Sequence, residues 1–89
     1  MNITSLAGAE IGQNADLDLV KECLGALTDR ELQVVEKRHP AVGKRTTLFW
    51  IGVGLGVTGE RVRQIYVKSA RKVRRRYGAE MRYRRENGR

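Results

Sequence analysis

Apolar residues recur at helical spacing between residues 57 and 74, where the clearest element of the chain is predicted. Thr58 precedes this pattern, and its hydroxyl can accept a hydrogen bond from a backbone N–H one turn into a helix. The apolar edge is narrow and follows the 3.6-residue period: Val62, Ile65, Ser69 and Val73. The opposite edge is polar: Glu60, Gln64 and Arg71, flanked by Arg61, Arg63, Lys68 and Lys72. The pattern predicts an amphipathic helix with one packing edge and one polar edge.

A shorter helix is predicted immediately before it. Thr47 can cap this helix, and Leu48, Ile51 and Leu55 supply its inward side. Gly56 follows where a short turn between helices needs a permissive backbone. Residues 47–76 therefore match the helix-turn-helix pattern, in which the second helix enters the major groove of DNA. An outer face of Glu, Gln, Arg and Lys side chains suits that groove.

Two further helices are predicted upstream. Residues 16–27 carry an apolar stripe at helical spacing: Leu17, Val20, Leu24 and Leu27. Thr28 and Glu31 form a capping-box pattern, in which each side chain bonds the backbone N–H of the other. The helix that they open turns Leu32 and Val35 inward and ends before Pro40. A connecting loop over residues 40–46 leads into the helix-turn-helix.

These elements predict a small all-α domain of about four helices over residues 16–77. Residues 1–15 are rich in small residues without a clear period and are expected to form a flexible arm with at most a turn of helix. Gly78 is well placed to end the last helix, which leaves residues 78–89 as a basic tail. Basic and aromatic residues alternate over 74–77 and 82–85, a composition that could grip phosphates and stack bases or simply form a solvated tail.

Charge is distributed very unevenly along the 89 residues, whose net charge is +8. Residues 1–40 carry four Lys or Arg against seven Asp or Glu, a net charge of −3. Residues 41–89 carry fourteen against three, a net charge of +11. The basic half contains the predicted recognition helix. This asymmetry indicates a polyanionic partner, most often nucleic acid.

Other classes of function find little support in the sequence. The apolar edge of the recognition helix contains no Leu, Phe or Trp, which disfavours binding to a membrane surface. No stretch is long and apolar enough to span a membrane, and no secretory signal is apparent. We therefore expect a cytoplasmic protein without a membrane partner. Cys23 is the single cysteine, fits a reducing compartment and borders the apolar stripe as a small packing residue. Neither Cys23 nor His39 has a partner for a metal site or a nucleophile–base pair. We therefore expect no enzyme activity, cofactor, metal or small-molecule substrate.

Three segments resemble the fourth conserved region of bacterial RNA polymerase sigma factors of the housekeeping class. They are residues 27–31 (LTDRE), residues 47–52 around Thr47-Leu48 and Ile51-Gly52, and above all residues 57–65 (VTGERVRQI). The resemblance covers roughly residues 20–76, and the Glu-Arg-Val-Arg-Gln-Ile core is more specific than a generic helix-turn-helix. It implies recognition of the upstream minus thirty-five promoter element in double-stranded DNA. It also implies docking on the flap of the RNA polymerase β subunit.

The resemblance also implies roles for individual residues. Glu60 and Gln64 match positions that contact bases, and their chemistry fits, since Gln can bond adenine N6 and N7 and Glu can accept from cytosine N4. The other polar positions of the helix are expected to hold the DNA backbone: Thr58, Arg61, Arg63, Lys68, Arg71 and Lys72.

Two positions depart from the family pattern. Gly59 replaces an Arg that reads a guanine, so this base contact is absent. Phe49 and Trp50 stand where acidic residues are usual. Two adjacent aromatic rings are expected either to form an exposed protein-binding patch or to place one ring under the N-terminal arm.

Two hypotheses on function follow. In the first, the chain is a small transcription regulator, by size and analogy from a phage or mobile element, that binds promoter DNA, RNA polymerase or both. In the second, it is a protein-binding mimic of the sigma domain that occupies the polymerase flap or another subunit and inhibits or redirects host transcription without specific readout of DNA. Glu60 and Gln64 favour the first hypothesis, whereas Gly59, Phe49 and Trp50 favour the second.

Overall fold

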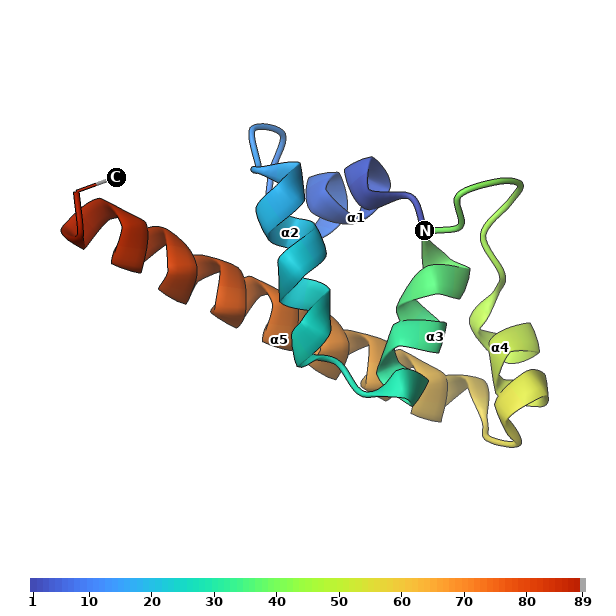
Figure 1. Cartoon of the computed structure of the whole chain (residues 1–89). Coiled ribbons are helices and arrows are strands. Elements are labelled where there is room, and N and C mark those ends of the chain that lie inside the picture. The colour runs from blue at the N-terminus through green and yellow to red at the C-terminus, as the bar shows by residue number, and fades with distance from the viewer. Residues whose placement is uncertain (89) are drawn as a thin grey trace.

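The computed structural model describes residues 1–88, which contain five α-helices and one 3₁₀ turn and no strand (Figure 1). In chain order they are α1 (Ile3–Glu10), α2 (Leu17–Cys23), the 3₁₀ turn η1 (Leu24–Ala26), α3 (Asp29–Arg38), α4 (Leu48–Leu55) and α5 (Gly59–Glu86). The prediction of a small all-α, helix-turn-helix fold is confirmed, with one helix more than expected.

Each helix begins after a side chain that accepts a hydrogen bond from the first turn. These N-cap residues are Asn2, Asp16, Thr28, Thr47 and Thr58. The capping box is confirmed, since Thr28 Oγ1 accepts from Glu31 N at 3.2 Å and Glu31 Oε1 accepts from Thr28 N at 2.9 Å. Polar caps of this kind fix helix starts locally, which is why the sequence predicts them well.

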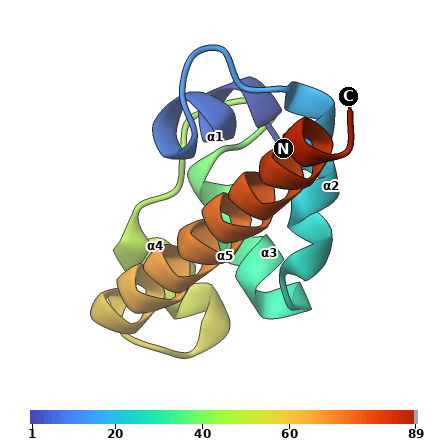
Figure 2. The same cartoon turned by 90° about the vertical axis from the view of Figure 1, so that its left-hand side faces the viewer.

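The other helices pack along the long helix α5 (Figures 1 and 2). The C-terminal end of α5 extends past them. Its predicted apolar edge is confirmed, because all four residues are buried: Val62, Ile65, Ser69 and Val73. Val62 and Ile65 pack against Val34 of α3 and Ile51 of α4. Val73 packs against Leu19 and Cys23 of α2. One edge of α5 therefore supplies the core to three helices.

The predicted helix over residues 16–27 is divided into α2 and η1. Its buried side is also rotated, since Leu19 is buried whereas Leu17 is 42% exposed. The reason is that α2 lies between α1 and α5 and buries two sides instead of a single stripe. Cys23 is a buried packing residue, as predicted, and burial raises the pKa of its thiol.

The expected flexible arm is instead the folded helix α1, so that prediction is wrong. Leu6 and Ala7 are buried against Val20 and Val35. The chain before α1 is also fixed, because Asn2 N donates to the carbonyl of His39 at 2.7 Å. Small residues suggest flexibility when considered alone, but one of them, Ala7, is buried in the core beside Leu6.

Gly78 does not end α5, which continues to Glu86. A glycine inside a helix costs about 1 kcal/mol relative to alanine. Long-range contacts offset this cost, since Tyr77 Oη accepts from Asp16 N at 2.9 Å and Arg84 lies 3.1 Å from the Asp16 carboxylate. The basic segment after Gly78 is therefore helical, and the expectation of a separate tail is corrected.

The turn between α4 and α5 depends on two glycines. Gly56 has a φ of +73°, a left-handed conformation that side chains with a Cβ rarely adopt. Gly52 lies under the turn, where a Cβ would come within 2.5 Å of the Val57 carbonyl oxygen. This close approach fixes the position of α4 against the turn that precedes α5.

Candidate nucleic-acid interface

The two predicted base-reading residues lie on the exposed side of the first turns of α5. Glu60 accepts two hydrogen bonds from the Arg63 guanidinium, at 3.0 Å from Nε and 2.7 Å from Nη2. Gln64 Oε1 accepts one from Arg61 Nη1 at 3.3 Å. All four side chains are exposed, and the structure brings them together as two pairs on one helix. In the free protein these polar groups therefore bond one another.

These pairs can be exchanged for contacts to DNA at little cost. Exposed ion pairs contribute little to stability, because water already solvates both partners well. The Arg63 hydrogen bonds hold the pKa of Glu60 below its usual range, so its carboxylate is ionised and only accepts. An accepting carboxylate complements the amino group of cytosine. The first turns of α5 thus expose one carboxylate acceptor, one amide and two guanidiniums, groups that can bond base edges and phosphates of DNA.

Thr58 and Gly59 place these groups at the start of the helix. Thr58 Oγ1 accepts from Arg61 N at 3.1 Å, and its hydroxyl proton can still donate to a phosphate. At Gly59 an added Cβ would lie 3.5 Å from Phe49 N, an ordinary contact distance. The structure therefore leaves space for a Cβ at Gly59.

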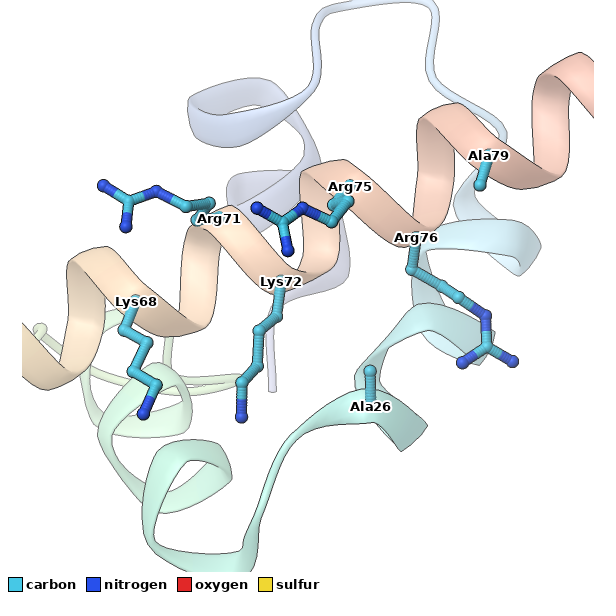
Figure 3. A pocket seen from close by; sticks show the side chains of 7 residues that line it. All are labelled: Ala26, Lys68, Arg71, Lys72, Arg75, Arg76 and Ala79. Carbon is cyan, nitrogen blue, oxygen red and sulfur yellow. The ribbon is translucent and has the colours of Figure 1, made fainter.

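The predicted backbone-contacting cations divide into two groups. Lys68 and Arg71 are exposed, and within residues 1–88 neither makes an ion pair or a side-chain hydrogen bond. Lys72 differs, because its Nζ lies 2.8 Å from Glu31 Oε1 of α3. In Figure 3 Lys72 extends toward the side on which Ala26 lies, whereas Arg71 does not. Lys72 thus has a partner within the protein, and its contact with DNA stays a prediction.

An open groove of about 520 Å³ follows this part of α5, beside η1 (Figure 3). Five of its lining residues are cationic and none is acidic: Ala26, Lys68, Arg71, Lys72, Arg75, Arg76 and Ala79. A concentration of like charges of this kind creates a positive potential that attracts a polyanion.

Glu31 connects α3 to the recognition helix. Its side chain is almost fully buried and accepts from both Thr28 N and Lys72 Nζ. Burial opposes ionisation of this carboxyl, but the hydrogen bonds from Lys72 and Thr28 outweigh it and lower its pKa. An ionised Glu31 therefore serves as helix cap and as counter-ion at the same time.

A polar network fixes α5 from the side opposite the interface. The Tyr66 hydroxyl donates to Glu10 Oε2 at 2.8 Å and lies 2.7 Å from His39 Nε2, while His39 Nδ1 lies 2.9 Å from Ser5 Oγ. Because the Tyr66 proton is used on Glu10, His39 Nε2–H donates to Tyr66 and Nδ1 accepts from Ser5. Arg74 also donates to Glu10. The network joins α1, the end of α3 and the middle of α5.

The electrostatics of this network favour one protonation state. Burial lowers the pKa of His39, and Arg45 and Arg38 add to this effect while Glu10 opposes it. Burial and the Glu10 carboxylate raise the pKa of Tyr66, so the phenol keeps its proton.

The sequence analysis did not identify the residues of this network, because their partners lie far apart in the chain. The sequence did contain a signal for α1, the helix that carries Ser5 and Glu10. Asn2 can cap a helix, and apolar residues follow it at helical spacing: Ile3, Leu6, Ala7 and Ile11.

Phe49 and Trp50 are both exposed, by 63% and 62%. Their rings pack edge to face with centroids 5.0 Å apart. Val53, one turn further along α4, is also exposed. Neither ring lies under the N-terminal segment, so the alternative in which α1 covers one of them is wrong. The outer side of α4 is an apolar patch formed by Phe49, Trp50 and Val53.

Residues 1–88 contain no group of three or more His, Cys, Asp and Glu side chains positioned to hold a metal ion. Within the same residues, no helix is long and apolar enough to cross a membrane.

A short helix, a glycine-dependent turn and an exposed polar recognition helix define a helix-turn-helix DNA-binding domain. Comparison with known families goes one step further: the profile of sigma-70, region 4, matches residues 23–75, more than half of the chain. The chain belongs to this family. No solved structure was found to match it.

Membership of this family assigns the protein to transcription regulation. Domains of this family bind DNA and RNA polymerase, and the family is regulatory, not enzymatic. The matched segment includes α3, α4 and the first part of α5, and the candidate interface lies on this part of α5. It leaves out α1, nearly all of α2 and the end of α5.

Proposed function

We propose that the protein regulates bacterial transcription by inserting the start of α5 into the major groove of promoter DNA beside RNA polymerase. Glu60 and Gln64 read base edges there. The DNA backbone is held by Thr58, Arg61, Arg63, Lys68, Arg71 and Lys72. The protein acts in the bacterial cytoplasm, with the polymerase β flap as its docking site.

The observation that carries this proposal is the position of Glu60 and Gln64. They are one turn apart at the exposed N-terminal end of α5, the end of a recognition helix that normally reaches bases. Their present partners are exposed side chains of the same helix, which can turn to phosphates when DNA binds. The buried polar network on the opposite side keeps α5 in place meanwhile.

We expect Gln64→Ala to weaken binding to the preferred duplex by about 1–3 kcal/mol, because a bidentate base contact is lost. The preferred sequence is first obtained by selection from random duplexes, and binding is then measured by fluorescence anisotropy. Binding to random duplexes should change little.

Gln33→Ala is the matched control, since Gln33 is exposed on α3 and lies outside the interface. An equal loss on preferred and random duplexes would show that Gln64 contributes no sequence preference. Absence of salt-sensitive binding by the wild-type protein would refute the whole proposal, since phosphate contacts make affinity fall with salt.

A second candidate function, binding to polymerase without specific readout of DNA, is supported by the apolar patch on α4. Exposed aromatic rings leave apolar area in water, and in small proteins such patches often mark interfaces. Aromatic residues, tryptophan above all, are frequent anchors of protein–protein interfaces. The partner that we propose is the RNA polymerase core enzyme, because domains of this family bind polymerase.

Trp50 is the only tryptophan, so its fluorescence reports directly on the patch. Addition of purified core polymerase should shift its emission to the blue, and Trp50→Ala should weaken the complex by about tenfold or more, as for a central aromatic anchor. Tyr83→Ala removes an equally exposed ring from α5 and serves as control. Unchanged emission together with full affinity of the Trp50→Ala variant would exclude the patch from the interface.

A further inference from the structure

The outer face of α5 runs on past residue 75, where the segment matched by the family ends. Arg71, Arg75 and Arg82 follow Gln64 at intervals of 7, 11 and 18 residues. At about 100° per residue these positions deviate by no more than about 20° from one line along the helix. The structure keeps α5 helical through all of them. A row of three guanidiniums therefore extends the face that begins with Gln64.

We propose that Arg75 and Arg82 form a second phosphate-binding track, which holds duplex DNA outside the groove that Glu60 and Gln64 read. This inference rests on the proposed DNA-binding function and extends it to the C-terminal half of α5.

Ion pairing distinguishes this row from three other cations of α5. Three cations on the inner sides pair with carboxylates from other helices or helix caps: Lys72 with Glu31, Arg74 with Glu10 and Arg84 with Asp16. Within residues 1–88, by contrast, Arg71, Arg75 and Arg82 make no ion pair and no side-chain hydrogen bond, and all three are exposed.

No acidic residue between Gln64 and Arg82 of α5 lies on the same side of the helix as the arginine row. Between Gln64 and Arg82 the only carboxylate on α5 is Glu80, and at about 100° per residue it lies on nearly the opposite side of the helix. Figure 3 shows that Arg71 and Arg75 lie over the helix away from Ala26, whereas Lys72 extends toward it. The row is thus cationic and has no ion-pair partner among residues 1–88.

Helix length indicates where this surface meets DNA. With a rise of about 1.5 Å per residue, Arg75 lies about 16 Å and Arg82 about 27 Å along the axis from Gln64. The major groove is only about 12 Å wide. When Gln64 reaches a base edge, Arg75 and Arg82 lie beyond the groove, against phosphates of the flanking backbone. These contacts add affinity without sequence preference.

The experiment compares two variants with the same loss of charge. In Arg75→Gln/Arg82→Gln both guanidiniums of the track are removed, and glutamine keeps a similar helix propensity. Because each lost phosphate contact removes about 0.9 from the slope of log K against log salt, the slope should fall by about 1.8 on preferred and random duplexes alike. Arg74→Gln/Arg84→Gln removes the same number of guanidiniums from the inner sides, where each pairs with a carboxylate, and should leave the slope almost unchanged.

Duplex length gives a second readout. The wild-type protein should lose affinity when the flanking base pairs of the selected site are trimmed, whereas the double variant should be insensitive to trimming. If the double variant retains the full slope while Gln64→Ala still loses sequence preference, the track is refuted and the groove contact stands. If the double variant binds DNA normally but loses core polymerase, the row is a protein-binding surface and the inference is wrong.

Discussion

Replacement of Gly52 by alanine is expected to destabilise the domain by about 1–3 kcal/mol, the usual cost of overpacking a tight site. A Cβ at this position would lie 2.5 Å from the Val57 carbonyl oxygen and 3.1 Å from the Thr58 carbonyl carbon. Both are backbone atoms of the turn, so no flexible side chain can yield. The turn itself has to move, and α5 begins directly after it.

The loss is measured by urea unfolding followed by circular dichroism. In a domain of this size each kcal/mol corresponds to a Tm shift of about 4–8 °C. Gly54→Ala is the matched control, because it lies on the same helix with no atom within 4 Å of its added Cβ. Alanine there should stabilise the helix by up to about 1 kcal/mol. Equal stability of the two variants would contradict the close approach of α4 to the turn.

Leu6→Ala is expected to cost about 2–5 kcal/mol of unfolding free energy, as for other buried leucines. Leu6 is only 1% exposed and packs with Val20 and Val35. Its truncation leaves a cavity between α1 and the helices below it. Since small domains have only about 5–15 kcal/mol of stability, this change removes a large part of it.

Thr4→Ala provides the comparison on the exposed side of α1 and should change stability by no more than about 0.5 kcal/mol. The same unfolding assay measures both variants. A Leu6→Ala protein as stable as the wild type would mean that residues 1–11 are a detachable arm, as their composition alone suggests.

Local chemistry made much of the interface predictable. The cap at Thr58, the capping box of Thr28 and Glu31, and the buried edge of α5 all involve residues within a few positions of one another. Helical spacing then fixes which side chains share a face, so the exposed positions of Glu60 and Gln64 follow from the buried positions of Val62 and Ile65.

Partners distant in the chain were not predictable in the same way. Glu10 meets Tyr66 and Arg74 across 56 and 64 residues, and no local pattern identifies such a pair. Gly78 illustrates the same limit, since a local preference for helix ending is overcome by contacts of the neighbouring residues with Asp16. Local propensity is a small energy that tertiary contacts can exceed.

The sequence by itself determined the helix-turn-helix, the polar face of its recognition helix and the basic half of the chain, because caps, periodicity and charge are local properties. Only the tertiary structure decided that residues 3–10 belong to the core, that Lys72 pairs with Glu31 while Arg71 has no ion-pair partner among residues 1–88, and that α5 continues as one helix to Glu86. These features depend on which surfaces meet after folding, and burial and ion pairing across distant segments set their energies.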